Sequence, residues 1–344
     1  MSAGAAGTES IEVLIGVLRK KQDWTPAQMR RFMTELMSGQ LETARVVEAL
    51  ELLRAKGETA AEITEAARAM REAGVRVQTG LPKVLDTCGT GGDGSCTVNV
   101  SSLSALIAAA AGVHVAKHGN RAVSGVCGSA DFLSAIGVPL EVAPEKLVRG
   151  LRETGFAFFY APQFHPSVRH AAAARKAITG RTMFNCLGPI TNPAGATHQL
   201  IGVYESRLVP LVAEALGALG ATHAIVVRSE DGLDEVSPAA ATDVAEWVGG
   251  SLRRYVFTPE EAGITRSAGG RLRSDNAESA VREGLAIIHG AQGPKTDLVA
   301  LNAGFALLAA DAVKSPAEGV RLAQKLLADG SVQKKVDQIK AFYK

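Results

Sequence analysis

The chain has 344 residues, 47% of them hydrophobic and 21% charged, which is typical of a globular protein with one large domain and a smaller one. A formal net charge of +2 and only 5% aromatic residues argue against nucleic acid as a partner. The chain shows no signal peptide, no membrane-spanning run and no C-x-x-C pair among its four cysteines, so we expect a cytoplasmic protein with free thiols and no membrane partner.

The first 74 residues carry four apolar stripes at helical spacing, which predicts a small helical bundle. The second stripe follows Thr25-Pro26, a cap with a first-turn proline, and consists of Met29, Phe32, Met33 and Leu36. Packing alone explains such a stripe, so we interpret it as core. A bundle of this size nevertheless leaves part of its apolar faces uncovered, which favours contact with a second copy of the chain.

Beyond Gly80, short apolar runs alternate with helical patterns, which predicts an α/β domain with a mainly parallel central sheet. The expected domains are a helical domain at residues 1–78 and an α/β domain at residues 79–164 and 183–344; the helical, alanine-rich segment at about 165–182 can join the first. Strands are expected at 84–85, 113–116, 156–160, 200–204 and 224–227, and helices at 98–111, 144–154, 208–219 and 277–289.

The strongest local signal is the glycine-rich run DTCGTGGDG at residues 86–94, between a predicted strand and a helix that opens near Asn99. Glycines let the backbone approach an anion closely, and a helix N-terminus adds N–H donors. The run is not a Walker A loop, because no Gly-Lys-Ser/Thr follows, and it does not fit G-x-G-x-x-G. We predict a phosphate-binding loop of another kind, although such turns also occur for structural reasons.

Polar residues follow two more of the predicted strands. Lys117-His118-Gly119-Asn120-Arg121 comes after the strand at 113–116, and Asp234-Glu235 lies beyond the strand at 224–227. Ligands of open α/β sheets bind beyond the carboxyl ends of the strands, so we expect these residues and the glycine-rich run to face one crevice. Two adjacent carboxylates can hold Mg²⁺ together with substrate phosphates. The helix start at 128–131 is a second possible anion site.

Together with Asn185-x-Leu187-Gly188-Pro189-x-x-Asn192-Pro193, these motifs resemble the anthranilate phosphoribosyltransferase family over nearly the whole chain. The resemblance implies a homodimer formed through the helical domain, with Mg²⁺ as cofactor. It also implies transfer of phosphoribose from phosphoribosyl pyrophosphate (PRPP) to the amine of anthranilate, with release of pyrophosphate, as a step of tryptophan biosynthesis.

The resemblance also implies roles for individual residues. The residues that match PRPP contacts are Gly89, Thr90, Gly92, Asp93, Thr97, Asn99, Ser101, Ser102 and Lys117. Those that match the anthranilate site are Gly89, His118, Asn120, His165 and Arg175, and those that match magnesium contacts are Ser101, Asp234 and Glu235. No covalent nucleophile is expected, so catalysis should depend on positioning and electrostatics.

Three positions depart from the family pattern, all near the expected acceptor site. Cys127 stands where serine is common, Val168 where methionine is common, and Ala173-Ala174 where Pro-Val is usual. Two other interpretations remain open. A pyrimidine nucleoside phosphorylase would share the fold and the glycine-rich loop but needs no Asp-Glu pair. A catalytically silent paralogue that binds nucleic acid would have a basic groove and would lack both polar motifs.

Overall fold

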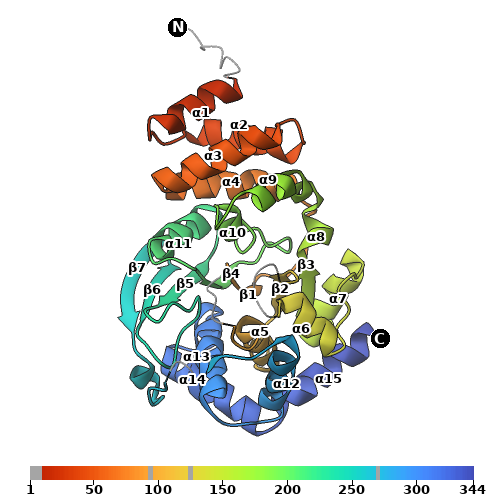
Figure 1. Cartoon of the computed structure of the whole chain (residues 1–344). Coiled ribbons are helices and arrows are strands. Elements are labelled where there is room, and N and C mark those ends of the chain that lie inside the picture. Colours follow the sequence, from red (N-terminus) through yellow and green to blue (C-terminus); the bar gives the residue numbers. More distant parts are fainter. Residues whose placement is uncertain (1–9, 92–95, 123–126, 269–271) are drawn as a thin grey trace.

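The N-terminal part of the chain is a bundle of four helices on one side of a larger α/β domain (Figure 1). The computed structural model describes residues 10–91, 96–122, 127–268 and 272–344. The four helices are α1 (Ile11–Arg19), α2 (Pro26–Met37), α3 (Thr43–Lys56) and α4 (Ala60–Glu72), as the apolar periodicity predicts. Thr25 and Thr59 begin α2 and α4 with capping boxes, in which the threonine side chain accepts a backbone hydrogen bond from the first turn.

The methionine-rich stripe of α2 is part of the core. Met29, Phe32 and Met33 are fully buried within this one chain, and Leu36 is 1% exposed. The interpretation as core is therefore confirmed, and this stripe is not among the apolar faces that a bundle of this size leaves uncovered. The stripe is covered because it belongs to a cluster that also contains α11 (Leu208–Ala218) and one face of the sheet.

The α/β domain is built on a seven-stranded sheet with the order β3-β2-β1-β4-β5-β6-β7. All neighbouring pairs from β3 to β5 are parallel, and β6 and β7 complete the sheet with antiparallel pairs. The strands are β1 (Leu85–Gly89), β2 (Val115–Gly119), β3 (Phe156–Tyr160), β4 (His198–Gly202), β5 (His223–Ser229), β6 (Thr242–Val248) and β7 (Ser251–Phe257). The predicted fold, a small helical domain with a mainly parallel α/β domain, is confirmed.

The position of β1 determines where a ligand can bind. The chain builds β1, β2 and β3 outward in one direction and then returns to place β4 on the other side of β1. The connections therefore diverge between β1 and β4, which makes this a topological switch point, where ligands bind beyond the carboxyl ends of the strands. The first half of the glycine-rich run belongs to β1, and Lys117 to Gly119 belong to β2. The glycine-rich run and the motif at 117–121 therefore begin inside strands rather than after them.

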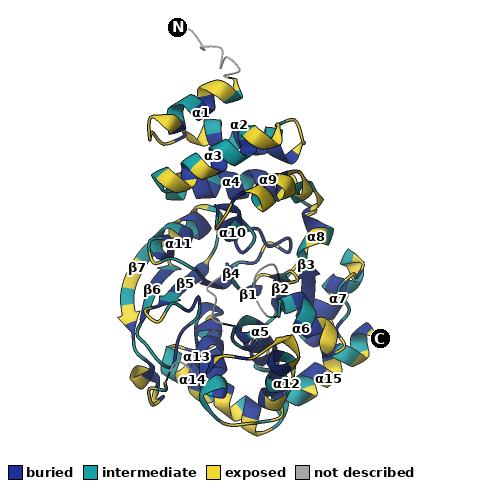
Figure 2. Cartoon of the chain, viewed as in Figure 1, coloured by how far each residue is buried: buried dark blue, intermediate teal, exposed yellow. Residues whose placement is uncertain are grey.

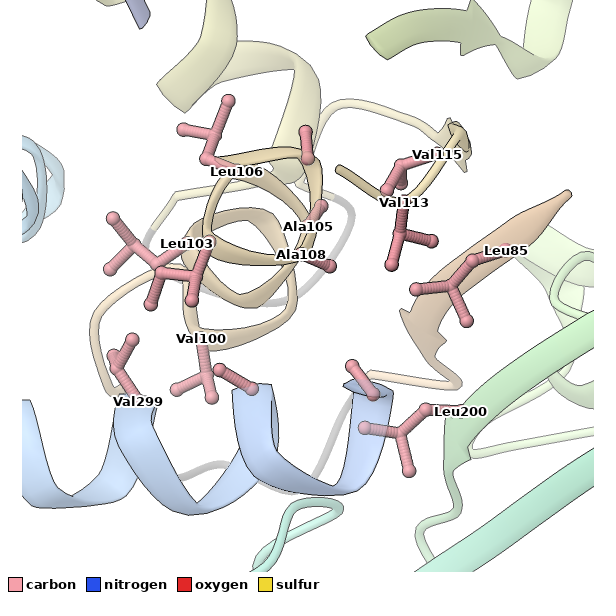
Figure 3. Close-up of a cluster of buried hydrophobic side chains, with 14 of the residues drawn as sticks. Leu85, Val100, Leu103, Ala105, Leu106, Ala108, Val113, Val115, Leu200 and Val299 are labelled. Carbon is pink, nitrogen blue, oxygen red and sulfur yellow. The ribbon is translucent and has the colours of Figure 1, made fainter. Parts of the chain in front are cut away.

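Helices cover both faces of the sheet. Helix α5 (Val100–Ala110) packs against β1 and against α13 (Pro294–Ala309), and Figure 3 shows Leu103 and Leu106 of α5 in the cluster that includes Leu85 and Val115. The parallel strands of the sheet are largely buried, whereas the edge strand β7 is mostly exposed (Figure 2). Alternate residues of the strands belong to different clusters: Leu200 faces α5 and α13, and its neighbour Ile201 belongs to the cluster of the helical bundle.

Several elements are absent from the sequence-based prediction. They include the hairpin of β6 and β7 and the C-terminal helices α13, α14 (Pro316–Ala328) and α15 (Ser331–Tyr343). Helix α13 is buried on nearly every side, so it has no polar face and no amphipathic stripe that would reveal it. None of the described helices has both the length and the continuous apolar character that a bilayer-crossing segment requires.

The alanine-rich segment at about 165–182, expected to be helical, consists of several short helical pieces. It contains the 3-10 turn η1 (Pro166–Ala171) and the short helix α9 (Ala172–Ala177), with α8 (Ala161–Phe164) before it and α10 (Phe184–Leu187) after it. Pro166 is the first residue of η1, where its missing N–H leaves no hydrogen bond unmade, and it disfavours a helical conformation at His165, so α8 does not continue into η1. Element η1 contacts α2 and α9 contacts α3, so this segment packs against the helical bundle.

Candidate active site

A crevice of about 790 Å³ opens at the carboxyl ends of β1 and β2, beside the switch point. Twelve of the site residues expected from sequence line it: Gly89, Thr90, Thr97, Asn99, Ser101, Lys117, His118, Asn120, His165, Arg175, Asp234 and Glu235. The expected contacts Gly92 and Asp93 lie outside the described residues. Segments far apart in the sequence thus meet in one cavity, as expected from the strand-end rule.

The floor of the crevice contains a buried ammonium group. Lys117 is 1% exposed, and its Nζ donates to the Thr87 carbonyl oxygen at 2.6 Å and to Ser101 Oγ at 3.2 Å. These two bonds use two of the three ammonium protons, which leaves one for a ligand. Burial lowers the pKa of Lys117, while the nearby Asp86 carboxylate acts in the opposite direction.

Asp86 compensates this charge from inside β1. Its Oδ1 accepts a hydrogen bond from the His118 backbone N–H at 3.1 Å, and its Oδ2 accepts one from Asn192 Nδ2 at 2.7 Å. Burial raises the pKa of Asp86 to about 6, although Lys117 and these hydrogen bonds act to lower it. Asn192 also donates to the Ala116 carbonyl oxygen at 2.8 Å, so one side chain joins β1, β2 and the loop that carries Asn192.

The Asp234-Glu235 turn packs directly on glycines of the sheet. Asp234 Oδ2 accepts a hydrogen bond from Gly91 N at 2.9 Å, and Gly91 has a φ of +64° that favours glycine. A Cβ on Gly89 would lie 2.7 Å from Asp234 Oδ2, and one on Gly202 would overlap the Asp234 carbonyl oxygen. These positions need glycine for the close approach, so two of the sheet's glycines place the acidic turn against the glycine-rich run.

The backbone of the glycine-rich run is partly committed to the protein itself. Thr90 N donates to the Gly202 carbonyl oxygen at 2.9 Å, and Thr90 Oγ1 accepts from Tyr204 N at 3.0 Å. Together with the bond from Gly91 to Asp234, these contacts occupy the described amides after Gly89. The Lys117 ammonium is therefore the clearest anion-binding group in the described part of this wall.

The start of helix α5 supplies polar groups at the edge of the crevice. Asn99 donates from Nδ2 to the Cys127 carbonyl oxygen at 2.9 Å, and its buried Oδ1 has no partner among the described residues. Ser101 lines the crevice, where its hydroxyl accepts the bond from Lys117. Ser102 is fully buried and is not part of the lining, because the next residue of a helix points about 100° away from Ser101. A direct phosphate contact by Ser102 therefore has no support in this geometry.

Two neutral histidines lie side by side further along the crevice, with ring centroids 5.2 Å apart. His118 Nδ1 is 3.1 Å from the Gly188 carbonyl oxygen, and His165 Nε2 is 2.9 Å from the Thr191 carbonyl oxygen. A carbonyl oxygen can only accept, so each of these ring nitrogens carries the proton and the other one is an acceptor. Burial lowers the pKa of His118 to about 3 and also lowers the pKa of His165, which keeps both rings uncharged at neutral pH.

Arg175 is half-buried in the wall of the crevice rather than solvated on an exposed helix. Its guanidinium lies 5.5 Å from the centre of the Phe184 ring, a cation–π distance, and burial lowers its pKa. Arg175 therefore presents a positive charge to the same cavity as the two histidines. Val168 and Cys127, which depart from the family pattern, also line the crevice.

The possible second anion site at 128–131 is not supported. The carboxylate of Asp131 accepts hydrogen bonds from the backbone N–H groups of Gly128 and Ala122, both at 3.0 Å, and pairs with Arg121 at 2.8 Å. The start of this short helix, α6 (Ser129–Ala135), therefore already holds an anion, its own aspartate.

The geometry is compatible with Mg²⁺ bound by the acidic turn. The described residues include no cluster of three or more histidine, cysteine or acidic side chains that could hold a metal by themselves. Mg²⁺ does not need such a cluster, because it usually takes one or two carboxylates and completes its shell with water and substrate phosphates. Asp234 and Glu235 supply the carboxylates at the rim of the crevice.

Sequence reasoning did not assign roles to several residues that shape this site. Asp86 and Asn192 form the buried network, and the carbonyls of Gly188 and Thr191 orient the two histidines. A charged residue within an apolar strand was an available signal for Asp86, because buried carboxylates need partners. The carbonyl partners leave no such signal, since every residue type has a backbone oxygen.

Comparison with known proteins places the chain in a family. A family model described as "Glycosyl transferase family, a/b domain" matches residues 81–333, and one described as "Glycosyl transferase family, helical bundle domain" matches residues 13–74. The anthranilate phosphoribosyltransferase of Symbiobacterium thermophilum is 44% identical over 332 residues, which cover 96% of this chain and 97% of the relative. The enzyme of the same name from Alkalilimnicola ehrlichii is 45% identical over 326 residues, covering 94% and 96%.

Solved structures of the same name share the fold. The crystal structure of anthranilate phosphoribosyltransferase from Thermus thermophilus superposes with a TM-score of 0.90 at 40% identity, covering 96% of this chain and 99% of that one. The Saccharomyces cerevisiae enzyme in complex with PRPP and Mg superposes with a TM-score of 0.86 at 24% identity, covering 97% and 98%. The second likeness is evidence for the fold alone.

The glycine cradle under Asp234 generates a prediction about stability. Changing Gly202 to Ala should lower the free energy of unfolding by about 1–3 kcal/mol, because the new Cβ would displace the Asp234 backbone in a packed interior. Gly16→Ala is the matched control, since a Cβ there meets nothing within 4 Å and Gly16 lies within α1. That change should stabilise the protein by up to about 1 kcal/mol. Equal effects of the two changes in denaturant unfolding would contradict the cradle.

Proposed function

The chain belongs to the anthranilate phosphoribosyltransferase family, and from that premise we propose that its crevice is the site of this reaction. The enzyme transfers the phosphoribosyl group of PRPP to the amine of anthranilate and releases pyrophosphate. The observation that carries the assignment is the polarity of the cavity. The buried ammonium of Lys117 lies at one part of it, and two neutral histidines and Arg175 line another.

PRPP would occupy the part next to β1 and α5. Its phosphates carry several negative charges, which the Lys117 ammonium and the polar start of α5 can offset. Asn99 Oδ1, buried and without a described partner, can accept from a hydroxyl group of the ribose. Asp86 keeps the net charge of the empty floor low, so that Lys117 remains protonated although it is buried.

Anthranilate would occupy the part lined by His118, His165 and Arg175. The Nε2 atom of His118 is an acceptor with no partner among the described residues, so an amine N–H of anthranilate can donate to it. The guanidinium of Arg175 can bind the anthranilate carboxylate through two parallel hydrogen bonds. The amine and the carboxylate are thereby held at fixed positions relative to PRPP, which lowers the entropic part of the barrier.

In the transfer step the amine nitrogen forms a bond to the anomeric carbon of the ribose as the bond to pyrophosphate breaks. The transition state should be oxocarbenium-like, by analogy with other glycosyl transfers. The new nitrogen–carbon bond makes the amine acidic, and its proton passes to an acceptor such as His118 Nε2. Mg²⁺ bound at the rim would neutralise the charge that develops on pyrophosphate.

The rival interpretations are less compatible with these observations. A nucleoside phosphorylase has no need for an acidic turn held against the glycine-rich run. A silent nucleic-acid-binding relative would lack the polar motifs, and both of them line the crevice here.

We assign magnesium binding to Asp234 and Glu235, and we expect the double change Asp234→Asn with Glu235→Gln to lower Mg²⁺-dependent kcat/KM by roughly 100-fold or more. Amide oxygens keep the shape of the turn and remove its charge. The measurement is anthranilate consumption followed by fluorescence at increasing Mg²⁺. Glu230→Gln, an exposed residue shortly before the turn, is the control. Full activity of the double variant at ordinary Mg²⁺ would remove both residues from the metal site.

Ser101 is a weaker candidate for a metal contact, because the Lys117 ammonium already donates a hydrogen bond to its hydroxyl.

Arg175 allows acceptor binding to be separated from PRPP binding. Arg175→Ala removes a charge-assisted hydrogen bond worth about 1.5–3 kcal/mol, so the KM for anthranilate should rise roughly 10- to 150-fold while the KM for PRPP barely changes. Arg175→Lys should recover only part of the loss, since a point charge cannot reproduce the planar fork. Lys176→Ala, on the exposed side of the same helix, is the control. An anthranilate KM that Arg175→Ala leaves unchanged would show that another group binds the carboxylate.

We also propose that two copies associate through the helical domain. The support is the family resemblance, together with Val13 on α1, which is 49% exposed although it is apolar. Light scattering at micromolar concentration should give twice the chain mass of 35.8 kDa. Val13→Glu should shift the mass toward the monomer, because it places a charge in the proposed contact. A monomeric mass for the unchanged protein would rule out the dimer.

A further inference from the structure

A second cavity, of about 580 Å³, lies where the helical bundle joins the α/β domain. Its walls are the end of α4, the linker at 75–81, the loop at 191–195 and the end of α11. We propose that this junction cavity binds a small ligand that carries an oxyanion, a phosphate or a carboxylate. Nothing in the transferase reaction requires such a site, and its position is distinct from the floor of the crevice.

Three arginines give the junction cavity an excess of positive charge. Arg68 and Arg71 come from α4, and Arg76 follows in the linker. The pKa of Arg71 is lowered to about 10, first by burial and then by repulsion from Arg76 and Arg68. Glu72 is the acidic residue of the described lining, and it already pairs with Arg30 at 2.9 Å. Arg68 is paired with Glu65 at 3.1 Å, so an anion in the cavity would mainly offset the repulsion between Arg71 and Arg76.

The central guanidinium is held in a fixed position. Arg71 donates from Nε and Nη2 to the Ile190 carbonyl oxygen, at 3.0 and 2.7 Å, and from Nη1 to the Leu219 carbonyl oxygen at 3.2 Å. Three of its five N–H groups are used in this way, which leaves two for a ligand. Arg76 is exposed and donates from Nε to the Arg71 carbonyl oxygen, so its two terminal nitrogens can reach the cavity. The site is therefore largely formed before a ligand arrives.

His165 connects the junction cavity to the crevice, because it lines both. Only 6% of His165 is exposed, and its Nδ1 has no partner among the described residues. A Cβ on Gly74 would lie 2.8 Å from this nitrogen, which places Nδ1 on the side of the linker. The positive charge of Arg71 contributes to the low pKa of His165, after burial. An anion beside Arg71 would therefore act on a ring that also faces the acceptor end of the crevice.

Apolar side chains line one part of the cavity, namely Val77, Leu81, Pro193, Ala194 and Leu219, and the polar residues Gln78, Thr79, Thr191 and Asn192 line another. The apolar side chains can cover the body of an organic anion, while the arginines bind its charged group. The shared chemistry is an oxyanion, which can come from free phosphate or from an organic acid. Inorganic phosphate and benzoate are the simplest probes of these two sources.

The test uses the full chain with PRPP and Mg²⁺ at saturating concentration, so that the phosphate sites of the crevice are filled. Phosphate and benzoate are titrated separately, and thermal unfolding is followed. A ligand that binds the folded state raises Tm in a saturable way. Arg76→Glu should weaken the binding by about tenfold or more, because it replaces a positively charged donor with a carboxylate that repels the anionic ligand. The affinity of Arg76→Lys should lie between those of the unchanged protein and Arg76→Glu, since lysine keeps the positive charge without the planar fork.

Arg321→Glu is the matched control. It makes the same change of charge at an exposed arginine on α14, at the far end of the molecule from α4 (Figure 1). It should leave the titrations unchanged. Saturation by phosphate alone would identify a phosphate site, and saturation by benzoate that is lost in Arg76→Glu would identify a carboxylate site. No saturable change with either probe, or equal binding in Arg76→Glu and Arg321→Glu, would overturn the proposal.

The shared wall has a kinetic consequence. Occupancy of the junction cavity should change the KM for anthranilate by about fivefold or more and leave the KM for PRPP unchanged, because within the crevice His165 lies beside His118, in the part proposed to bind anthranilate. The change should be absent in Arg76→Glu. A binding site that leaves the anthranilate KM unchanged would rule out the coupling through His165. The binding titrations do not depend on turnover, so the site and the transferase assignment can fail separately.

Discussion

The rest of the site depends on one buried group, the Asp86 carboxylate, and on its contacts with Asn192 and the backbone of His118. A carboxylate inside a sheet must be compensated, and Asp86 is compensated by two hydrogen bonds and by the charge of Lys117. Asn192 adds a bond to β2, so β1, β2 and the following loop share one arrangement. That loop then provides the carbonyl oxygens that fix the tautomers of His118 and His165. One polar network thus fixes both the floor around Lys117 and the wall that carries the two histidines.

The helical domain is not an independent body resting on the sheet. Its apolar stripes share one core cluster with α10, α11 and the nearer face of β4 and β5. The part of the crevice that we assign to the acceptor is accordingly lined by residues packed against the bundle, with Met70 from α4 and Arg175 from α9. The floor around Lys117 belongs to the α/β domain alone. Substitutions in the bundle core should therefore affect acceptor binding before they affect PRPP binding, since displacement of packed elements is transmitted locally.

Glycine has two different uses around the crevice. Gly91 is required for its backbone conformation, because its φ is positive. Gly89 and Gly202 are required for space, because the Asp234 turn lies against them. Both uses place the acidic turn beside the end of β1. The two carboxylates therefore lie beside the glycine-rich run, although they are far from it in the sequence.

The sequence by itself determined the class of the protein, because its signals are local. Helical periodicity and capping residues act within a few positions, which is why α1 to α4 and the five parallel strands could be predicted, and contiguous motifs revealed the family. Only the tertiary structure decided which groups pair, namely Asn192 with Asp86 and backbone carbonyl oxygens with the two histidines. It decided that Ser102 is buried and that Arg68, Arg71 and Arg76 line one cavity. It also decided that α13 is a helix buried on nearly every side. These features depend on contacts between distant segments, and backbone carbonyls and buried volumes leave no mark on residue type.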